Sequence, residues 1–307
     1  MKRCGTYFVA AVVGLLTTMS ASARAQSYIP FTNYLPPLTS DPTEYESGYN
    51  DYCRDDTGQV NTYRCVDKVI REMTARYDRY HRTCDHRGVF SLVYLVTTQE
   101  YQRASLEPGF FDDTEFLNHY DTVFAQFYFH ASDAWARGDL AHVPPVWQVA
   151  FSSAQGRSVT TLGDMMLGMA AHILRDLPIV IATIGLTDPE TGLSRKPDHD
   201  AVNAFLARVV VDPAIQAAWD PSFSTSVPGL PISPNAAVTA TIQAWREAAW
   251  RWAELLISAP TSEAQADVIM QIEWYAYTQA LAFQASTSYL RPLQSSVQRD
   301  LFCMNHR

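Results

Sequence analysis

The stretch "TTLGDMMLGMAAHILRDLP", Thr160 to Pro178, decides the fold of this chain, and its apolar character continues to Leu186. Thr161 stands three residues before Asp164, a spacing typical of a helix N-cap and its third residue. Few polar residues interrupt the apolar run that follows. Helices that are apolar nearly all round lie at the centre of a domain. We therefore predict a central helix that begins at Thr161 and that Pro178 kinks or ends.

A second segment has the same character. In "DDTEFLNHYDTVFAQFYFHASDAWARGD", Asp112 stands three residues before Glu115, and Gly138 follows the last periodic positions. The first pair resembles a capping box, and glycine commonly follows a helix C-terminus. The pattern predicts a long second helix between Asp112 and Gly138, again apolar nearly all round.

Helical signals fill most of the remaining chain. Apolar residues recur three and four positions apart, or start and stop signals bracket a segment, over residues 62–82, 85–104, 198–211, 234–258 and 262–289, with a short helix from Pro213. The β-branched run Val93–Thr98 is compatible with a strand, but its neighbours are helical and no partner strand is evident. The sequence predicts one all-α domain, residues 61–307, built from several helices around two central apolar ones.

The N-terminus has the features of an exported protein. Lys2 and Arg3 precede an apolar run of about ten residues, and Ala23-Arg24-Ala25 fits a signal peptidase site. This predicts a signal peptide at residues 1–25, an irregular arm at 26–60, and a secreted or periplasmic mature protein. The run is shorter than the roughly 20 residues of a membrane span, and we expect no transmembrane segment later in the chain.

The number of cysteines and the net charge bear on the compartment and the partners of the protein. Four cysteines follow the signal, an even count that predicts two disulfides. Of three connectivities we favour Cys53 with Cys65 and Cys84 with Cys303. Loss of the signal removes three of 23 basic residues and none of 32 acidic ones, which leaves a net charge of 20 − 32 = −12. Such a surface argues against nucleic acid as a partner. The oligomeric state is not set by the sequence.

Two polar side chains in the predicted central helix are the main candidates for a functional site. His172 and Asp176 are one helical turn apart and face the same way, and Gly168, one turn earlier, leaves room beside the imidazole. Asp176 can fix the tautomer of His172 so that its other nitrogen acts as a general base, or both can ligate one metal ion. A satisfied structural hydrogen bond is the alternative.

The second apolar helix also carries polar residues. Gln126, His130 and Asp133 fall within about 40° of His119 on the helical wheel. Asp121 faces a different direction, so we do not expect Asp121 and His130 to reach the same point.

Three segments of the chain resemble an uncharacterised family of helical bacterial proteins. They are Asp85-x-Arg87-x-x-Phe90-x-x-x-Tyr94-x-x-x-Thr98, Asp121-x-x-Phe124-Ala125-x-x-Tyr128, and Gly168-Met169-x-Ala171-His172-Ile173-x-x-Asp176-Leu177-Pro178. The resemblance covers roughly residues 71–211 and implies no known activity. It implies that Asp85, Arg87, Asp121, His172 and Asp176 belong to one constellation, because polar residues in apolar motifs are costly to bury unpaired. Arg87 is then a candidate partner of Asp121 or Asp176, either in a structural ion pair or as an oxyanion clamp.

Several other candidates have simpler explanations. His81 and His86 lie in a charge-dense segment typical of a solvated helix end, and Asp198-His199-Asp200 suits a helix start. Glu273 is surrounded by aromatic residues, where a buried carboxyl has a raised pKa and can act as an acid. The motifs of serine hydrolases and of His-Glu-x-x-His metalloproteases are absent.

Two functions fit these observations. The first is a secreted metal-dependent hydrolase of an ester or phosphoester, with a lipid-like substrate. In it His172, Asp176 and Arg87 are catalytic, and a divalent ion such as zinc is held by His172 and Asp176 with Asp121 and His130 as further candidate ligands. The second is a non-enzymatic protein that binds a hydrophobic small molecule in its apolar interior while the polar pairs are merely satisfied.

Overall fold

The computed structural model describes residue 53 and residues 62–206, 208–209, 212–223, 234–290 and 292–307. This part of the chain is helical, and its only β-type pairings are two isolated bridges, Val159 with Ser288 and Thr187 with Ser194. The all-α prediction is confirmed, including helix rather than strand over Val93–Thr98. The predicted signal peptide and nearly all of the predicted N-terminal arm lie outside the described residues.

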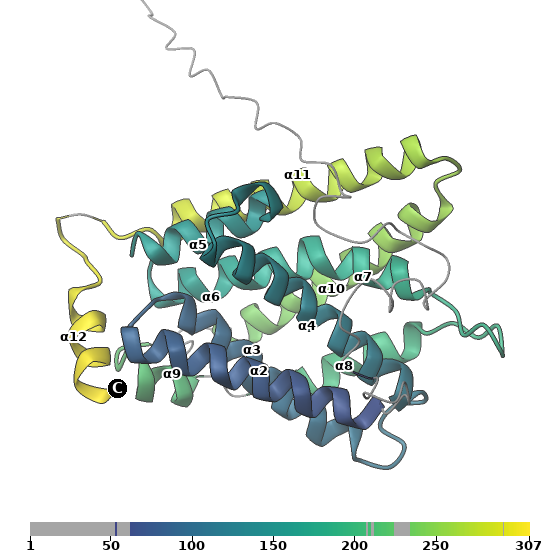
Figure 1. The fold of residues 1–307 in the computed structure, drawn as a ribbon, viewed down its shortest axis with the longest axis horizontal. Coiled ribbons are helices and arrows are strands. Elements are labelled where there is room, and N and C mark those ends of the chain that lie inside the picture. The colour runs from purple at the N-terminus through teal and green to yellow at the C-terminus, as the bar shows by residue number, and fades with distance from the viewer. Residues whose placement is uncertain (1–52, 54–61, 207, 210–211, 224–233, 291) are drawn as a thin grey trace, which may run out of the picture.

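The helices are labelled in chain order in Figure 1. Their bounds are α2 Thr62–Thr83, α3 Arg87–Ser105, α4 Thr114–Ala136, η2 Leu140–His142, α5 Pro145–Gln155, α6 Thr161–Ala170, η3 Ala171–Asp176, α7 Leu177–Ile184, α8 Lys196–Leu206, α9 Asp212–Ala218, α10 Pro234–Ser258, α11 Ser262–Thr287 and α12 Val297–His306.

The stretch Thr160–Pro178 lies in one continuous helical segment, α6–η3–α7. Its N-cap is Thr160, one residue before the predicted cap Thr161, because the hydroxyl of Thr160 accepts a hydrogen bond from the Gly163 backbone at 3.3 Å. Residues Ala171–Asp176 form a π-helical turn, and the helix resumes and ends at Ile184. Pro178 has no N–H to donate to the preceding turn, which favours a local widening of this kind.

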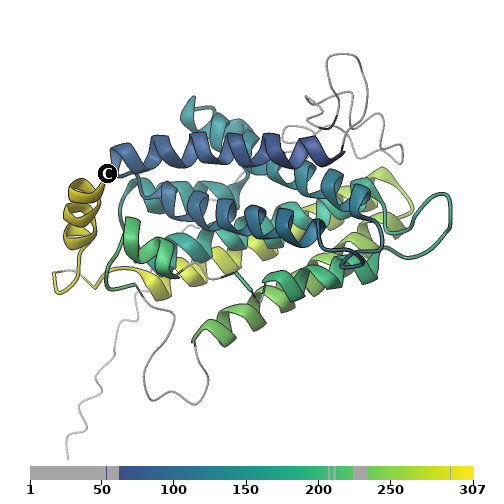
Figure 2. The same ribbon diagram turned by 90° about the horizontal axis from the view of Figure 1, so that it is seen from below.

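This segment is the centre of the molecule. It contacts α3, α4, α5, α10 and α11, the helices that lie around it in Figures 1 and 2. Apart from Leu162 and Met169, its residues are buried from Thr161 to Ile184. Contrary to our expectation, this helix, alone among those of the described residues, is long and apolar enough to cross a membrane, yet 89% of its apolar window is buried inside the fold. Such burial is typical of a core helix.

The structure has one central apolar helix where the sequence predicted two. Helix α4 packs against α2 and α7, and its His130 is exposed to solvent. Its cap is Asp113, whose carboxylate accepts from the Phe116 backbone at 2.9 Å, one residue after the predicted start. The helix ends at Ala136, and Gly138 takes the left-handed conformation, φ 74°, that glycine allows without strain.

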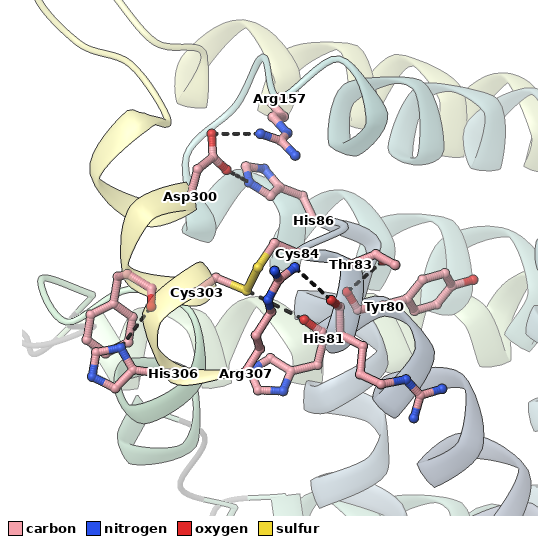
Figure 3. Close-up of a disulfide and its surroundings, with 12 residues drawn as sticks. Tyr80, His81, Thr83, Cys84, His86, Arg157, Asp300, Cys303, His306 and Arg307 are labelled. Atoms are coloured by element: carbon pink, nitrogen blue, oxygen red, sulfur yellow. Dashed lines mark hydrogen bonds and ion pairs between the residues drawn. A yellow bond between two sulfur atoms is a disulfide. The ribbon is translucent and has the colours of Figure 1, made fainter.

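Both favoured disulfides are confirmed: Cys53 is bonded to Cys65, and Cys84 to Cys303. The second bond fastens α12, which lies at one end of the molecule, to the turn after α2 (Figures 1 and 3). Beside it, His86 contacts Asp300 at 2.8 Å, and Arg157 pairs with the same carboxylate at 2.9 Å (Figure 3). Two disulfides are typical of an oxidising, extracytoplasmic compartment.

Candidate functional site

The His172–Asp176 pair predicted from the sequence forms inside the π-helical turn. The Nδ1 atom of His172 lies 3.0 Å from Oδ2 of Asp176, and both side chains are buried. A carboxylate only accepts hydrogen bonds, so Nδ1 carries the proton and Nε2 presents its lone pair. That Nε2 atom is buried and has no hydrogen-bond partner in the protein. Isolated π-turns occur frequently at functional sites.

Asp176 is held by three donors at once. Besides His172, the indole N–H of Trp147 donates to its Oδ2 at 2.9 Å, and the Arg175 guanidinium donates to its Oδ1, also at 2.9 Å. Arg175 also pairs with Glu273 at 2.7 Å. The carboxylate therefore has no oxygen left uncommitted, and its role is to orient His172 and to balance the charge of Arg175.

Glu273 is buried as the sequence predicted, and burial raises the pKa of its carboxyl while the nearby Arg175 opposes that shift. Its second oxygen, Oε2, has no hydrogen-bond partner. The side chain does not line the cavity that His172 faces. We therefore assign Glu273 to the support of Arg175.

Aromatic rings surround the imidazole of His172. The Phe124 ring stacks on it with centroids 3.5 Å apart and planes within 6°, and the Tyr94 ring meets it edge-on at 4.6 Å. The space that Gly168 leaves is filled by Phe90, since a Cβ added at Gly168 would lie 2.3 Å from Cγ of that ring. Burial lowers the pKa of His172, although the hydrogen bond to Asp176 opposes this, so the imidazole is neutral near pH 7.

The imidazole lines a cavity of about 100 Å³ with mainly apolar walls. For comparison, an apolar cavity of about 150 Å³ holds one benzene molecule. The side chains that matter below are Phe90, Tyr94, Asp121, Phe124, His172 and Arg246. They come from α3, α4, η3 and α10, and α8 also lines the cavity, so the cavity lies between the central helix and α3, α4, α8 and α10.

Asp121 lines the same cavity as His172, whereas His130 does not, in agreement with the different directions that helical spacing predicted for Asp121 and His130. Its Oδ2 atom is buried without a hydrogen-bond partner, and so is the hydroxyl of Tyr94. Burial raises the pKa of Asp121 to about 7. Three of the residues that line the cavity thus each carry a buried polar atom without a protein partner: Nε2 of His172, Oδ2 of Asp121 and Oη of Tyr94.

The structure separates Arg87 from this group. Its guanidinium pairs with Asp85, two residues earlier, at 3.0 Å, and lies 4.9 Å from the centre of the Tyr80 ring. The expectation that Arg87 is the partner of Asp121 or Asp176 is wrong, because a neighbouring carboxylate satisfies it first and Arg175 takes the place beside Asp176.

The four candidate metal ligands also do not converge. His130 is exposed on α4, away from the cavity, and all the oxygens of Asp176 are committed to donors. In the described part of the chain, no group of three or more His, Cys, Asp or Glu side chains is arranged to hold a metal ion. Of the predicted ligands, His172 and Asp121 alone reach the cavity.

Sequence reasoning missed Arg246 and Trp147. Arg246 is 5% exposed and lies on α10 in register with the buried Ala249 and Ala253. A basic residue at an apolar helix position is the signal that marks it. Trp147 comes from α5, a helix that the sequence analysis did not predict, and only tertiary packing brings its indole to Asp176.

The chain matches a family of unknown function (DUF5995) over residues 66–285. It belongs to the DUF5995 family. No curated protein and no solved structure matches. The DUF5995 match extends beyond the segments that carried the resemblance, to α10 and nearly all of α11. It therefore takes in Arg246 and Glu273 as well as His172 and Asp176.

Proposed function

We propose that this DUF5995 protein binds a small, mainly apolar molecule in the cavity beside His172, and that Nε2 of His172 accepts a hydrogen bond from the one polar group of that molecule. One observation carries the proposal: His172, whose Nδ1 is fixed by Asp176 and whose Nε2 is buried without a partner, lines a mainly apolar cavity. The prediction of a hydrophobic small-molecule ligand is thus the one that the geometry supports best.

The energetics favour a ligand over a purely structural pair. A buried polar atom without a partner costs about 1–3 kcal/mol, and three residues that line this cavity each carry one. A molecule with a hydroxyl or similar group would satisfy Nε2, while the rings of Phe124 and Tyr94 would enclose its apolar part. Buried polar groups in proteins are otherwise almost always paired.

A second candidate, ester hydrolysis, is favoured by the tautomer of His172. With Nδ1–H held by a carboxylate, Nε2 is placed to remove a proton from water as the water oxygen attacks an ester carbonyl carbon. The resulting imidazolium then returns the proton to the leaving alkoxide, which departs as an alcohol. The predicted zinc-dependent form of this reaction requires a ligand set that the residues at the cavity do not provide, so we assign no step to a metal.

We place the protein outside the cytoplasm, secreted or periplasmic. The two disulfides support this location, and so do the basic start, apolar run and Ala23-Arg24-Ala25 of the sequence.

The first test is metal analysis of the mature protein as purified, and a stoichiometric ion that His172→Ala abolishes would restore the metal hypothesis. The binding tests then use the protein after treatment with a chelator. Binding of primary alcohols from 1-butanol to 1-octanol is then followed by NMR titration. We expect saturable binding that His172→Asn weakens about fivefold or more, since asparagine can still donate to Asp176 but lacks an atom at the Nε2 position.

The matched control is His142→Asn, because His142 also contacts an aspartate, Asp139, at 2.8 Å but is exposed and remote from the cavity. This control should bind like the wild type. Turnover of a short-chain ester by the metal-free protein, lost in His172→Asn, would favour the hydrolase. No saturable binding of any alcohol, or binding insensitive to His172→Asn, would refute the proposal.

A further inference from the structure

We propose that the cavity ligand is a short monocarboxylic acid whose carboxylate pairs with Arg246. This inference rests on the proposed function and names the chemical class of its ligand. It follows from a buried cation on the cavity wall that forms no ion pair with a carboxylate of the described residues.

Arg246 is bonded only to neutral groups. Its Nε donates to the Asn203 side-chain oxygen at 3.0 Å, and one terminal nitrogen donates to the His199 backbone carbonyl at 2.6 Å. The Tyr120 hydroxyl lies beside the guanidinium. Within the described residues no carboxylate forms an ion pair with Arg246, although the side chain is 5% exposed.

The acidic residues near α10 are committed elsewhere. Asp200 and Glu247 both pair with Lys196, and Glu247 pairs with Arg251 as well. Asp121 shares the cavity but is not paired with Arg246, and burial holds the pKa of its carboxyl near 7, so it is largely protonated in mildly acidic solution. A buried charge is unfavourable unless an opposite charge compensates it, so the guanidinium calls for an anion from outside the protein.

The aromatic residues on the cavity wall indicate where the apolar part of that anion lies. Rings of Tyr120, Phe124 and His172 stack in sequence, with centroids 6.4 Å apart for the first pair and 3.5 Å for the second. Arg246 lies at the Tyr120 end of this stack and Nε2 belongs to the ring at the other end. A carboxylate at Arg246 therefore directs an apolar chain along the stack toward His172.

The charge balance limits the ligand to a monoanion. Arg246 is the one lysine or arginine among the described residues that line the cavity. A phosphate dianion would leave uncompensated negative charge among apolar walls, whereas a carboxylate matches the guanidinium with two parallel hydrogen bonds. The volume of about 100 Å³ favours a short chain over a long acyl chain.

Calorimetric titrations of the metal-free mature protein with hexanoate and with 1-hexanol at about pH 6.5 test this inference. The two probes share a chain length and differ in charge. We expect the wild type to bind hexanoate at least about tenfold more tightly than 1-hexanol. Arg246→Gln should lose that preference, and Arg246→Lys should keep part of it. Arg251→Gln, the same charge change on an exposed position of α10, should behave like the wild type.

The outcomes are distinct. Equal affinity of the wild type for acid and alcohol overturns the carboxylate inference but leaves the proposed function standing, and so does an acid preference that survives in folded Arg246→Gln. Failure of the wild type to bind either probe overturns both. If Arg246→Gln does not fold, as judged by circular dichroism, the wild-type comparison and Arg246→Lys still decide the question.

Discussion

Replacing Asp176 by asparagine tests whether its carboxylate holds the site together. The side chain is fully buried and accepts hydrogen bonds from Trp147, His172 and Arg175 at 2.9, 3.0 and 2.9 Å. Asparagine has nearly the same shape, but one of its two ends is a donor. In either orientation of the amide, at least one of the three donors therefore faces another donor.

The least costly orientation of the introduced amide determines the expected loss of stability in Asp176→Asn. If the amide nitrogen faces Arg175, the bonds from Trp147 and His172 survive and the ion pair is lost. Breaking a buried pair by removing one partner costs about 3–5 kcal/mol. Arg175 retains Glu273, at 2.7 Å, which places the expected loss near the lower end, about 3 kcal/mol. For a domain of this size each kcal/mol lowers the melting temperature by about 2–4 °C, so we expect a fall of roughly 6–12 °C.

Thermal unfolding followed by circular dichroism provides the measurement, and Asp139→Asn is the matched control. Asp139 also contacts a histidine, but the pair is exposed, and its loss should change the melting temperature by no more than about 2 °C. The imidazole ¹⁵N spectrum of His172 gives a second readout, since Nδ1–H should dominate in the wild type. A melting temperature of Asp176→Asn within about 2 °C of the wild type would refute the reasoning.

Three further predictions concern other parts of the molecule. Gly168→Ala should lower the melting temperature, because the added Cβ would lie 2.3 Å from Cγ and 2.8 Å from Cβ of Phe90. Overpacking costs about 1–3 kcal/mol, which outweighs the helix-propensity gain of about 1 kcal/mol. A higher melting temperature would contradict this packing. Asp121→Asn should become progressively more stable relative to the wild type as pH rises from about 4 to 7. The buried carboxyl, with its pKa near 7, keeps its proton in the folded state while the unfolded chain releases it, so wild-type stability falls across that window. Unfolding at pH 4, 5.5 and 7.5 would measure the difference in stability between Asp121→Asn and the wild type. A difference that does not change with pH would count against the burial of Asp121. Finally, exported protein should begin at or near Gln26 and contain no thiol titratable under denaturing conditions, whereas one thiol per chain would rule out two complete disulfides.

The fold was largely predictable from local patterns. Helical periodicity and the cap near Thr160 identified the central helix, because hydrogen bonding along a helix fixes which residues share a face and an all-round apolar helix has to be covered. The same regularity correctly placed Asp121 and His130 on different faces of α4. The apolar pattern led us to predict that α4 is as central as the α6–η3–α7 segment. The apolar content of a helix indicates how much of it is buried, but not which of two apolar helices lies innermost.

The candidate site was predictable only in part. His172 and Asp176 lie four residues apart on one helix, so their contact needs no information beyond helix geometry. Arg87 was assigned a distant partner, although its own neighbour Asp85 was available at almost no cost in chain entropy. A pair between near neighbours in the sequence costs less chain entropy than a long-range pair with Asp121 or Asp176.

By itself, the sequence determined an all-helical chain with a buried core helix, a His–Asp pair within that helix, and an even set of cysteines. Only the tertiary structure determines which other charged residues line the cavity beside this His–Asp pair. Arg246, from α10, and Asp121, from α4, meet at one cavity because α4 and α10 pack against the same central segment. Helical spacing specifies the faces of each helix, but the order in which helices pack depends on side-chain shapes contributed by several of them at once, and no single segment contains that information.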